Sequence, residues 1–218
     1  MTESRGATLR EAARTFVTHP SPRLLLAGAA VSVGARALVG DWTAADAIVV
    51  GVLLVAQPFV EWLIHVYLLH WRPRQIAGRR IDPVPGRSHR RHHRDPQDPR
   101  FIFLYVRAVA GLLVLHLLGW TVAAVTSWAV ATGLVTSLLL TLAYEWTHHL
   151  IHTTYVPRRS FYRSLWRAHR LHHFRNENYW YGVTSGLGDR VLGTYPKKND
   201  VPLSPTATSL AQLSGRGV

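Results

Sequence analysis

The strongest constraint on the fold is a set of four apolar stretches, each close to the length that crosses a lipid bilayer. They are Leu24–Val39, Ala44–Trp71, Phe101–Trp120 and Val122–Tyr144. About 20 apolar residues span the hydrocarbon core of a bilayer as a helix. The fourth stretch contains no charged residue, so it lacks the polar face that a helix of a soluble protein presents to water. The sequence therefore predicts an all-α integral membrane protein with about four transmembrane helices.

The third and fourth stretches are predicted to form a helical hairpin. From Phe101 to Tyr144 they cover 44 residues, and one helix of that length would be about 66 Å long, roughly twice the hydrocarbon thickness. The chain must therefore cross twice. Gly119–Thr121 is the predicted tip of the hairpin, with Trp120 in the interfacial aromatic belt. The first stretch is short and interrupted by Arg36, which leaves a tilted span and a re-entrant segment as alternatives.

Basic residues gather in three segments that the predicted topology places on one side of the membrane. The chain has a formal net charge of +13, and segments 1–23, 72–100 and 156–175 carry net charges of +2, +6 and +6. Four crossings put these segments on the same side, and the positive-inside rule makes that side cytoplasmic, together with both termini. The basic excess is thus interpreted as a topology signal, with the membrane rather than a nucleic acid as the partner.

Composition and missing motifs exclude several classes of function. The chain has no Cys, which excludes a disulfide scaffold, a thiolate nucleophile and an iron–sulfur cluster. The motifs H-E-x-x-H, G-x-S-x-G and the P-loop are absent from the sequence, which disfavours the enzymes that use them. No signal peptide is predicted, because the first apolar run begins late and no cleavage pattern precedes it. Basic residues are almost all Arg, a composition typical of GC-rich genomes, so a bacterial cytoplasmic membrane is the predicted location.

The chain is predicted to have three parts. Residues 1–22 form a cytoplasmic arm, and residues 23–196 form the transmembrane domain. Residues 197–218 form a polar, disordered tail, because Ser, Thr, Gly and Pro accumulate there without apolar periodicity.

Ten of the 13 histidines fall into four clusters whose spacing is typical of metal binding. The clusters are His65 and His70 (H-x4-H), His89, His92 and His93 (H-x2-H-H), His148 and His152 (H-x3-H), and His169, His172 and His173 (H-x2-H-H). On a helix, residues three and four apart share a face, so these boxes direct several imidazoles the same way. The H-x4-H pair lies about 140° apart on a regular helix. It therefore requires a helix end, a distortion, or a metal reached from two sides.

Ten imidazoles exceed what one ion can hold and predict two metals. Zinc takes four ligands and an octahedral ion six, so two ions would share the ten at about five each, with a position open for oxygen. The predicted topology brings the inner ends of the second and fourth spans to the side where both H-x2-H-H boxes lie. All four clusters can therefore meet. So many neighbouring imidazoles would repel one another if protonated, whereas metal binding uses their neutral form.

Five further residues are weighed beside these clusters. His19 and His116 are predicted to be polar anchors at the membrane interface. His149 follows the first residue of the H-x3-H pair and is predicted to be a neighbour of the site or a surface residue. Glu61 and Glu145 each precede a histidine cluster by one helical turn. They either accept hydrogen bonds that orient imidazoles or pair with a neighbouring Arg.

The order of the four clusters resembles the histidine boxes of the fatty acid hydroxylase/sterol desaturase superfamily of membrane-bound di-iron oxygenases. The segment Tyr181–Thr194 (YGVTSGLGDRVLGT) is also similar to that group, and fatty acid 2-hydroxylases are the most similar within it. The resemblance covers residues 45–196 and is specific for the superfamily rather than the substrate. It implies that all ten clustered histidines are metal ligands, and that His148 rather than His149 belongs to the site. Asp189 is a further candidate to support the ligands.

The resemblance also implies an activity. It implies a four-span helical core with a cytoplasmic helical cap holding two Fe, which zinc can replace in purified protein. It implies O2-dependent hydroxylation of an unactivated C–H bond of a membrane lipid, foremost a fatty acyl chain. A separate electron donor is expected, either a cytochrome b5-like protein, a ferredoxin or a reductase, because residues 1–23 are too few for a fused cytochrome b5 domain.

Two alternatives remain open at this point. One is a sterol or carotenoid oxidase or desaturase of the same superfamily. The other, from a different class, is a His-rich membrane protein that binds or transports metal. A transporter needs ligands along a path near the bilayer midplane, whereas here the clusters lie at one end of the predicted spans, which argues against transport.

Overall fold

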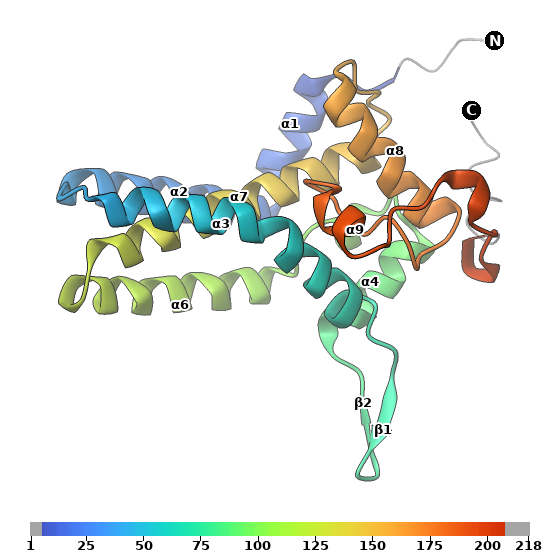
Figure 1. Cartoon of the computed structure of the whole chain (residues 1–218), viewed down its shortest axis with the longest axis horizontal. Coiled ribbons are helices and arrows are strands. Elements are labelled where there is room, and N and C mark those ends of the chain that lie inside the picture. Colours follow the sequence, from blue (N-terminus) through green and yellow to red (C-terminus); the bar gives the residue numbers. More distant parts are fainter. Residues whose placement is uncertain (1–5, 208–218) are drawn as a thin grey trace. The chain divides into compact units, whose positions relative to one another are not determined.

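The computed structural model describes residues 6–207, which are mostly helical (Figure 1). The helices are α1 (Leu9–Thr18), α2 (Pro20–Val39), α3 (Ala44–Leu63), the π-helix η1 (Ile64–Leu69), α4 (Val84–Arg94), α5 (Pro99–Ile102), α6 (Val106–Val125), α7 (Trp128–His152), α8 (Ser160–Phe174), α9 (Leu187–Val191) and the 3₁₀-helix η2 (Lys198–Asp200). Strands β1 (Arg74–Ile76) and β2 (Arg79–Ile81) pair antiparallel, with Gln75 opposite Arg80. Both strands are exposed along their whole length.

Within residues 6–207, four helical segments are long and apolar enough to cross a membrane, as the sequence predicted. They are Pro20–Val39, Ala44–Leu69, Pro99–Val125 and Trp128–His152. The first is one continuous helix of 20 residues, longer than the apolar stretch because it starts at a proline. Proline suits the first turn of a helix, where its missing N–H would have no intrahelical partner.

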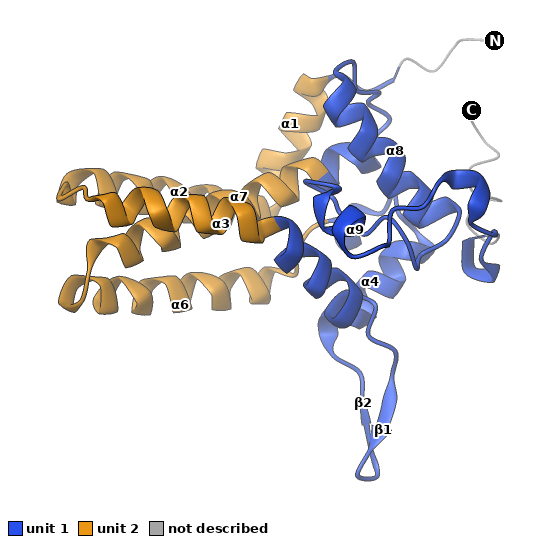
Figure 2. Cartoon of the chain, viewed as in Figure 1, with its two compact units in different colours: residues 1–8, 58–102, 148–218 blue, residues 9–57, 103–147 orange. Residues whose placement is uncertain are grey.

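The chain divides into two compact units (Figure 2). Among the described residues, unit 1 comprises 6–8, 58–102 and 148–207, and unit 2 comprises 9–57 and 103–147. The divisions fall inside α3 and α7. Unit 2 contains α1, α2, α6 and most of α3 and α7, around a core of Leu25, Val109 and Leu138.

The hairpin of unit 2 turns later than the sequence predicted. The predicted tip at Gly119–Thr121 lies inside α6, and the turn is at Thr126 and Ser127. A Cβ on Gly119 would lie 2.8 Å from a methyl carbon of Leu134, so this glycine allows α6 and α7 to approach closely. The Ser127 hydroxyl oxygen accepts a hydrogen bond from the Ala129 N–H at 3.3 Å. A serine cap of this kind favours a helix start at that point.

The charge in the first apolar stretch is paired rather than exposed to lipid. The buried Arg36 guanidinium donates to Asp46 Oδ1 at 2.7 Å and to Thr132 Oγ1 at 2.7 Å. Its guanidinium carbon also lies 3.7 Å from the ring centroid of Trp42. A buried charge is tolerated when it is paired and hydrogen-bonded, so α2 continues past Arg36 without a break.

His116 joins two helices instead of anchoring the chain at an interface. It lies in the middle of α6 and is buried. Its Nδ1 is 2.8 Å from the Leu112 carbonyl oxygen, and its Nε2 is 3.0 Å from Ser137 Oγ on α7. Inside a helical hairpin a polar side chain is favourable when both of its polar atoms have partners.

Unit 1 contains η1, the β1–β2 hairpin, α4, α5, α8, α9 and η2. Its apolar cluster is formed by Ala168, Trp180 and Val201. Val201 belongs to the predicted disordered tail, but it is buried here, as are Ser204 and Ala207, and the Arg175 Nε–H donates to the Val201 carbonyl oxygen at 2.8 Å. The sequence of this segment has no apolar periodicity, so it did not predict that Val201 would be buried. Residues 208–218 of the predicted tail lie outside the described residues.

Candidate metal centre

All ten clustered histidines come together in unit 1, as two groups of five. The first group is His65, His70, His89, His93 and His172. The second group is His92, His148, His152, His169 and His173. Within each group the candidate ligand nitrogens all lie within 4.8 Å of one another. Among the described residues, both groups consist of histidine alone, and neither includes His149.

The π-helix η1 explains how the H-x4-H pair reaches one centre. The His70 N–H donates to the His65 carbonyl oxygen at 3.0 Å, a hydrogen bond between residues five apart that defines a π turn. This wider turn places the two rings nearly parallel, at 29°, with centroids 5.2 Å apart. The required distortion is therefore present, and π turns of this kind are frequent at functional sites.

Each H-x2-H-H box divides its histidines between the two groups. On α4, His89 and His93 belong to the first group and His92 to the second; on α8, His169 and His173 belong to the second and His172 to the first. Residues four apart on a helix point in nearly the same direction, and the intervening residue points to one side. Thus α4 contributes two histidines to the first group and one to the second, whereas α8 contributes one to the first and two to the second.

Backbone carbonyls fix the orientation and tautomer of three imidazoles. The bonds run from Nδ1 of His65 to the Tyr181 oxygen (2.6 Å), from Nδ1 of His148 to the Ile102 oxygen (2.9 Å), and from Nδ1 of His172 to the Tyr179 oxygen (2.8 Å). A carbonyl oxygen only accepts, so Nδ1 carries the proton in each case. The lone pair of each neutral ring is then on Nε2, and this tautomer can bind a metal through Nε2.

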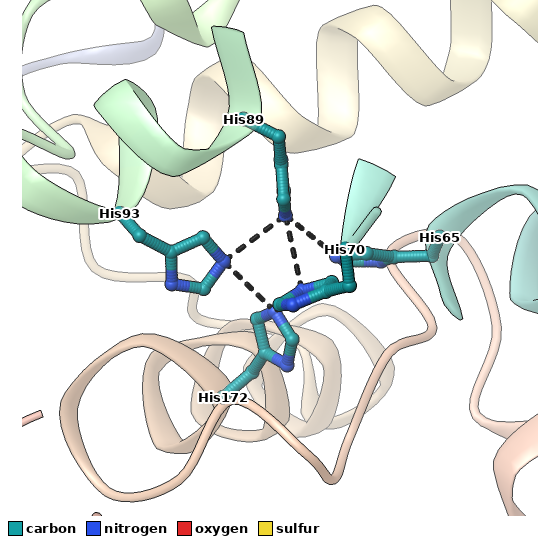
Figure 3. Close-up of side chains that lie close together, drawn as sticks. All are labelled: His65, His70, His89, His93 and His172. Atoms are coloured by element: carbon teal, nitrogen blue, oxygen red, sulfur yellow. Dashed lines mark hydrogen bonds between the residues drawn. The ribbon is translucent and has the colours of Figure 1, made fainter. Parts of the chain in front are cut away.

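The Nε2 atoms of the first group converge as ligands of one ion would. Figure 3 shows the five rings turned toward a common centre. Nε2 of His89 lies 3.1 Å from that of His65, 3.2 Å from that of His70 and 3.0 Å from that of His93. Nε2 of His172 lies 3.2 Å from Nε2 of both His70 and His93. Nitrogens bound to one ion at 2.0–2.1 Å are separated by about 2.9–3.4 Å, so the group fits a metal ion.

The second group has the same arrangement. Nε2 of His152 lies 3.1 Å from Nε2 of His92 and 3.2 Å from Nε2 of His169. Nε2 of His169 lies 3.1 Å from that of His173. Free lone pairs held this close repel one another, whereas a cation between them would turn the repulsion into coordination. Both groups therefore present a donor set that could hold a metal.

Burial keeps the imidazoles neutral. His89, His92, His169, His172 and His173 are buried, and burial lowers the pKa of each far below the usual value. Burial also lowers the pKa of His93, to about 4. Desolvation disfavours the charged imidazolium, and repulsion from neighbouring histidines adds to the effect. Neutral imidazole is the ligand form, so the environment suits metal binding at neutral pH.

Glu61 neither contacts an imidazole nor pairs with an Arg among the described residues, so neither of its two predicted roles applies directly. Its buried carboxylate accepts hydrogen bonds from the N–H groups of Val183 and Thr184, the latter at 3.0 Å, and from the Thr184 hydroxyl. These residues follow Tyr181, whose carbonyl oxygen accepts the His65 bond. Glu61 thus holds the backbone segment that orients a candidate ligand.

Asp189 holds the same segment from its other end. Oδ1 accepts from the Tyr181 N–H at 2.9 Å and from the Thr194 hydroxyl at 2.6 Å, and Oδ2 accepts from the Gly182 N–H at 2.7 Å. Burial raises the pKa of Asp189, and these three donors oppose that rise. The motif that contains Asp189 is therefore an anchored loop whose backbone touches a candidate ligand.

Glu145 belongs to unit 2 and is not brought to the histidine groups. Its Oε1 accepts from the Ser21 hydroxyl and from the Leu104 N–H, both at 3.0 Å. Within the described residues no ion pair joins it to an Arg. Sequence reasoning also missed Tyr181, Tyr179 and Ile102, because their contribution to the site is a backbone carbonyl that any residue could supply.

A cavity of about 840 Å³ reaches the histidines of unit 1. The imidazoles on its wall are those of His70, His89, His93 and His173. The end of η1 and the residues that follow it line another part of the wall with Val66, Tyr67 and Trp71. This volume and partly apolar lining are typical of a site for an organic ligand, here one that could lie directly beside the candidate metal ligands.

Comparison with known proteins connects this arrangement to one family. Residues 50–194 match the profile of the fatty acid hydroxylase family. The dihydroceramide fatty acyl 2-hydroxylase FAH2 of Arabidopsis thaliana is 30% identical over 142 residues, which cover 63% of this chain and 56% of that protein. The ceramide very long chain fatty acid hydroxylase SCS7 of Saccharomyces cerevisiae is 30% identical over 154 residues, 66% of this chain and 37% of that protein.

A solved structure is similar over most of the chain. It is that of full-length scs7p, in which only the hydroxylase domain is visible, with a TM-score of 0.61 at 20% identity over 91% of this chain and 70% of that one. At this identity the likeness shows a shared fold. The chain spans about half the length of the Arabidopsis relative, 56%.

Proposed function

The chain belongs to the fatty acid hydroxylase family, and from this premise we propose that it is a membrane-bound di-iron monooxygenase. The proposed reaction hydroxylates an unactivated C–H bond of a lipid, foremost of a fatty acyl chain. The observation that carries the proposal is the pair of five-histidine groups beside a cavity of about 840 Å³. The histidine boxes and the lipid hydroxylases among its relatives support the same reading.

The ten histidines would hold the two metal ions, and the backbone would hold the histidines. When bound, two iron ions supply the redox chemistry that lets O2 attack an alkyl carbon. The carbonyl oxygens of Tyr181, Ile102 and Tyr179 fix three rings with Nε2 inward. Glu61 and Asp189 fix the loop that carries Tyr181. Preorganised ligands of this kind cost little reorganisation on metal binding.

The chain's part in turnover is to bind and position the lipid. Val66, Tyr67 and Trp71 offer an apolar wall beside His70 and an acyl chain would lie along it. Insertion of one oxygen atom consumes O2, two electrons and two protons and yields the alcohol and water. The electrons are proposed to come from a separate donor, a cytochrome b5-like protein, a ferredoxin or a reductase.

Lipid mass spectrometry tests the proposed reaction. Cells that express the protein are expected to contain acyl lipids heavier by one oxygen, and growth under ¹⁸O2 should label that oxygen. Cells that express His93→Ala at the same level are the matched control and should lack the product. A loss of two hydrogens in place of a gained oxygen would indicate a desaturase. No change in any lipid would contradict the assignment as a lipid oxidase.

Elemental analysis tests the number of metals. Gently purified protein is expected to contain about two ions per chain, because ten imidazoles exceed the ligands that one ion can accept. Iron is the expected metal, with zinc where iron has been displaced. A content of one ion or fewer in protein that still forms product would contradict the two-metal proposal.

Reporter fusions test the proposed location in the membrane. The basic segments lead us to propose that the N-terminus, segment 72–100 and the chain after His152 face the cytoplasm, in a bacterial cytoplasmic membrane. Fusions after Ser88 and Ser164 should therefore report the cytoplasmic side, and a fusion after Asp41, between α2 and α3, should report the opposite side. If Ser88 and Ser164 reported opposite sides, the four histidine clusters would be separated by the membrane, contrary to a single site.

A further inference from the structure

We propose that the lipid bound in the cavity carries an anionic headgroup, a carboxylate or a phosphate, which Arg72, Arg74 and Arg94 bind. These three residues are called the rim arginines below. The inference deepens the proposed function and rests on it. The two relatives described above are named for dihydroceramide and ceramide, which are uncharged lipids.

The lining of the cavity combines buried and exposed side chains. His173 is 1% exposed and Tyr181 is 7% exposed, and both line the cavity together with buried His89. The rim arginines line the same cavity but are exposed. A ligand that fills the cavity would therefore contact both the candidate metal ligands and the guanidinium groups.

Among the described residues the rim arginines have no carboxylate partner, unlike Arg90, the fourth arginine of the cavity. Arg90 donates to Asp82 Oδ1 at 2.7 Å and to the Trp71 carbonyl oxygen at 2.6 Å. Within residues 6–207, no ion pair involves a rim arginine. The guanidinium carbon of Arg74 lies 5.3 Å from the Trp71 ring centroid, which leaves its N–H donors available. Three arginines are thus free to bind an anion, while Arg90 has a structural role.

The charge inside the cavity is strongly unbalanced. Among the described residues that line it, Glu177 is the only acid, and its carboxylate accepts a hydrogen bond from the Ser204 hydroxyl at 2.5 Å. The histidine groups add no negative charge, since both contain only neutral imidazoles. One carboxylate therefore faces three rim arginines. A concave site with such an excess concentrates positive potential and attracts an anionic ligand.

The chemistry of the walls then specifies the class of lipid. Val66, Tyr67 and Trp71 suit an acyl chain, and guanidinium groups bind carboxylate or phosphate through two parallel hydrogen bonds. A lipid with a neutral headgroup would fill the apolar part but leave the arginines without a charged partner. A free fatty acid or an anionic phospholipid fits both parts of the cavity.

Binding measurements test this without turnover. The full-length protein in nanodiscs of neutral lipid is titrated with palmitic acid, dipalmitoyl phosphatidic acid, N-palmitoyl ceramide and inorganic phosphate. The two anionic lipids are expected to bind about ten-fold or more tightly than the ceramide, as charge-assisted hydrogen bonds would provide. The double variant Arg74→Gln/Arg94→Gln should lose this preference and bind ceramide as the wild type does. Arg74→Lys/Arg94→Lys should retain part of it.

Arg79→Gln is the matched control. Arg79 is exposed and lies on β2, in the same hairpin as Arg74, but it does not line the cavity. It should bind all lipids as the wild type does. Equal wild-type affinity for ceramide and the anionic lipids would overturn the inference. An equal loss of affinity for all lipids in the double variant would also overturn it. Inorganic phosphate that competed for the site as well as phosphatidic acid would overturn it too. A preserved anionic preference with no hydroxylated product would instead contradict the proposed function alone.

Discussion

His148→Ala is expected to abolish product formation and to remove about one of the two metal ions, whereas His149→Ala should spare both for the most part. His148 belongs to the second histidine group, and its ring is held by the Ile102 carbonyl oxygen at 2.9 Å. His149 follows it on α7 and lies outside both groups among the described residues. Successive residues on a helix point about 100° apart, so the neighbour cannot replace the lost ligand.

The two variants separate the loss of a ligand from the loss of a buried side chain. Both histidines are 3% exposed, so each substitution leaves a comparable cavity in the same helix. Metal content and product formation are measured for each purified variant, with thermal unfolding to confirm that both fold. The ligand assignment on α7 would be wrong if His149→Ala lost metal while His148→Ala kept it, although two metals could then still be held through His149 and His152.

The membrane helices could be predicted because length and hydropathy determine them almost locally. The positions of turns and bends could not, because they depend on partners distant in sequence. Gly119 suggested a turn, yet it lies within α6, where its missing side chain leaves room for Leu134 of α7. Arg36 suggested a break, but Asp46 and Thr132 satisfy its guanidinium. In each case a contact across helices outweighs a local preference.

The set of ten histidines followed from their spacing, but their division into two groups did not. Spacing shows that His89, His92 and His93 share a broad face of α4, whereas only the packing of η1, α4, α7 and α8 decides which ring meets which. The H-x4-H pair was the exception, since its spacing already demanded a distortion, and η1 supplies it. Backbone carbonyls that orient the rings leave no mark in the sequence.

Asp189→Ala is expected to weaken metal binding by about 10–100-fold, the usual effect of removing groups that support metal ligands. The carboxylate accepts the N–H groups of Tyr181 and Gly182 at 2.9 and 2.7 Å, and the Tyr181 carbonyl oxygen accepts the His65 Nδ1–H at 2.6 Å. Without Asp189 two buried N–H groups lose their acceptor, at a cost of about 1–3 kcal/mol each. The loop would shift, and the His65 ring would lose its fixed orientation.

A graded series distinguishes this positioning role from a general loss of stability. Asp189→Asn keeps the shape and one acceptor oxygen, so its loss of metal affinity should fall between that of wild type and that of Asp189→Ala. Asp95→Ala, which removes an exposed acid of the same unit, is the control and should bind metal as the wild type does. Metal affinity is measured by competition with a chelator, below the unfolding temperature of each variant. If Asp189→Ala bound metal as tightly as Asp95→Ala, the loop would not orient the ligand. If metal affinity decreases from wild type to Asp189→Asn and further to Asp189→Ala, the buried Asp189 carboxylate supports the first histidine group through the Tyr181 carbonyl oxygen.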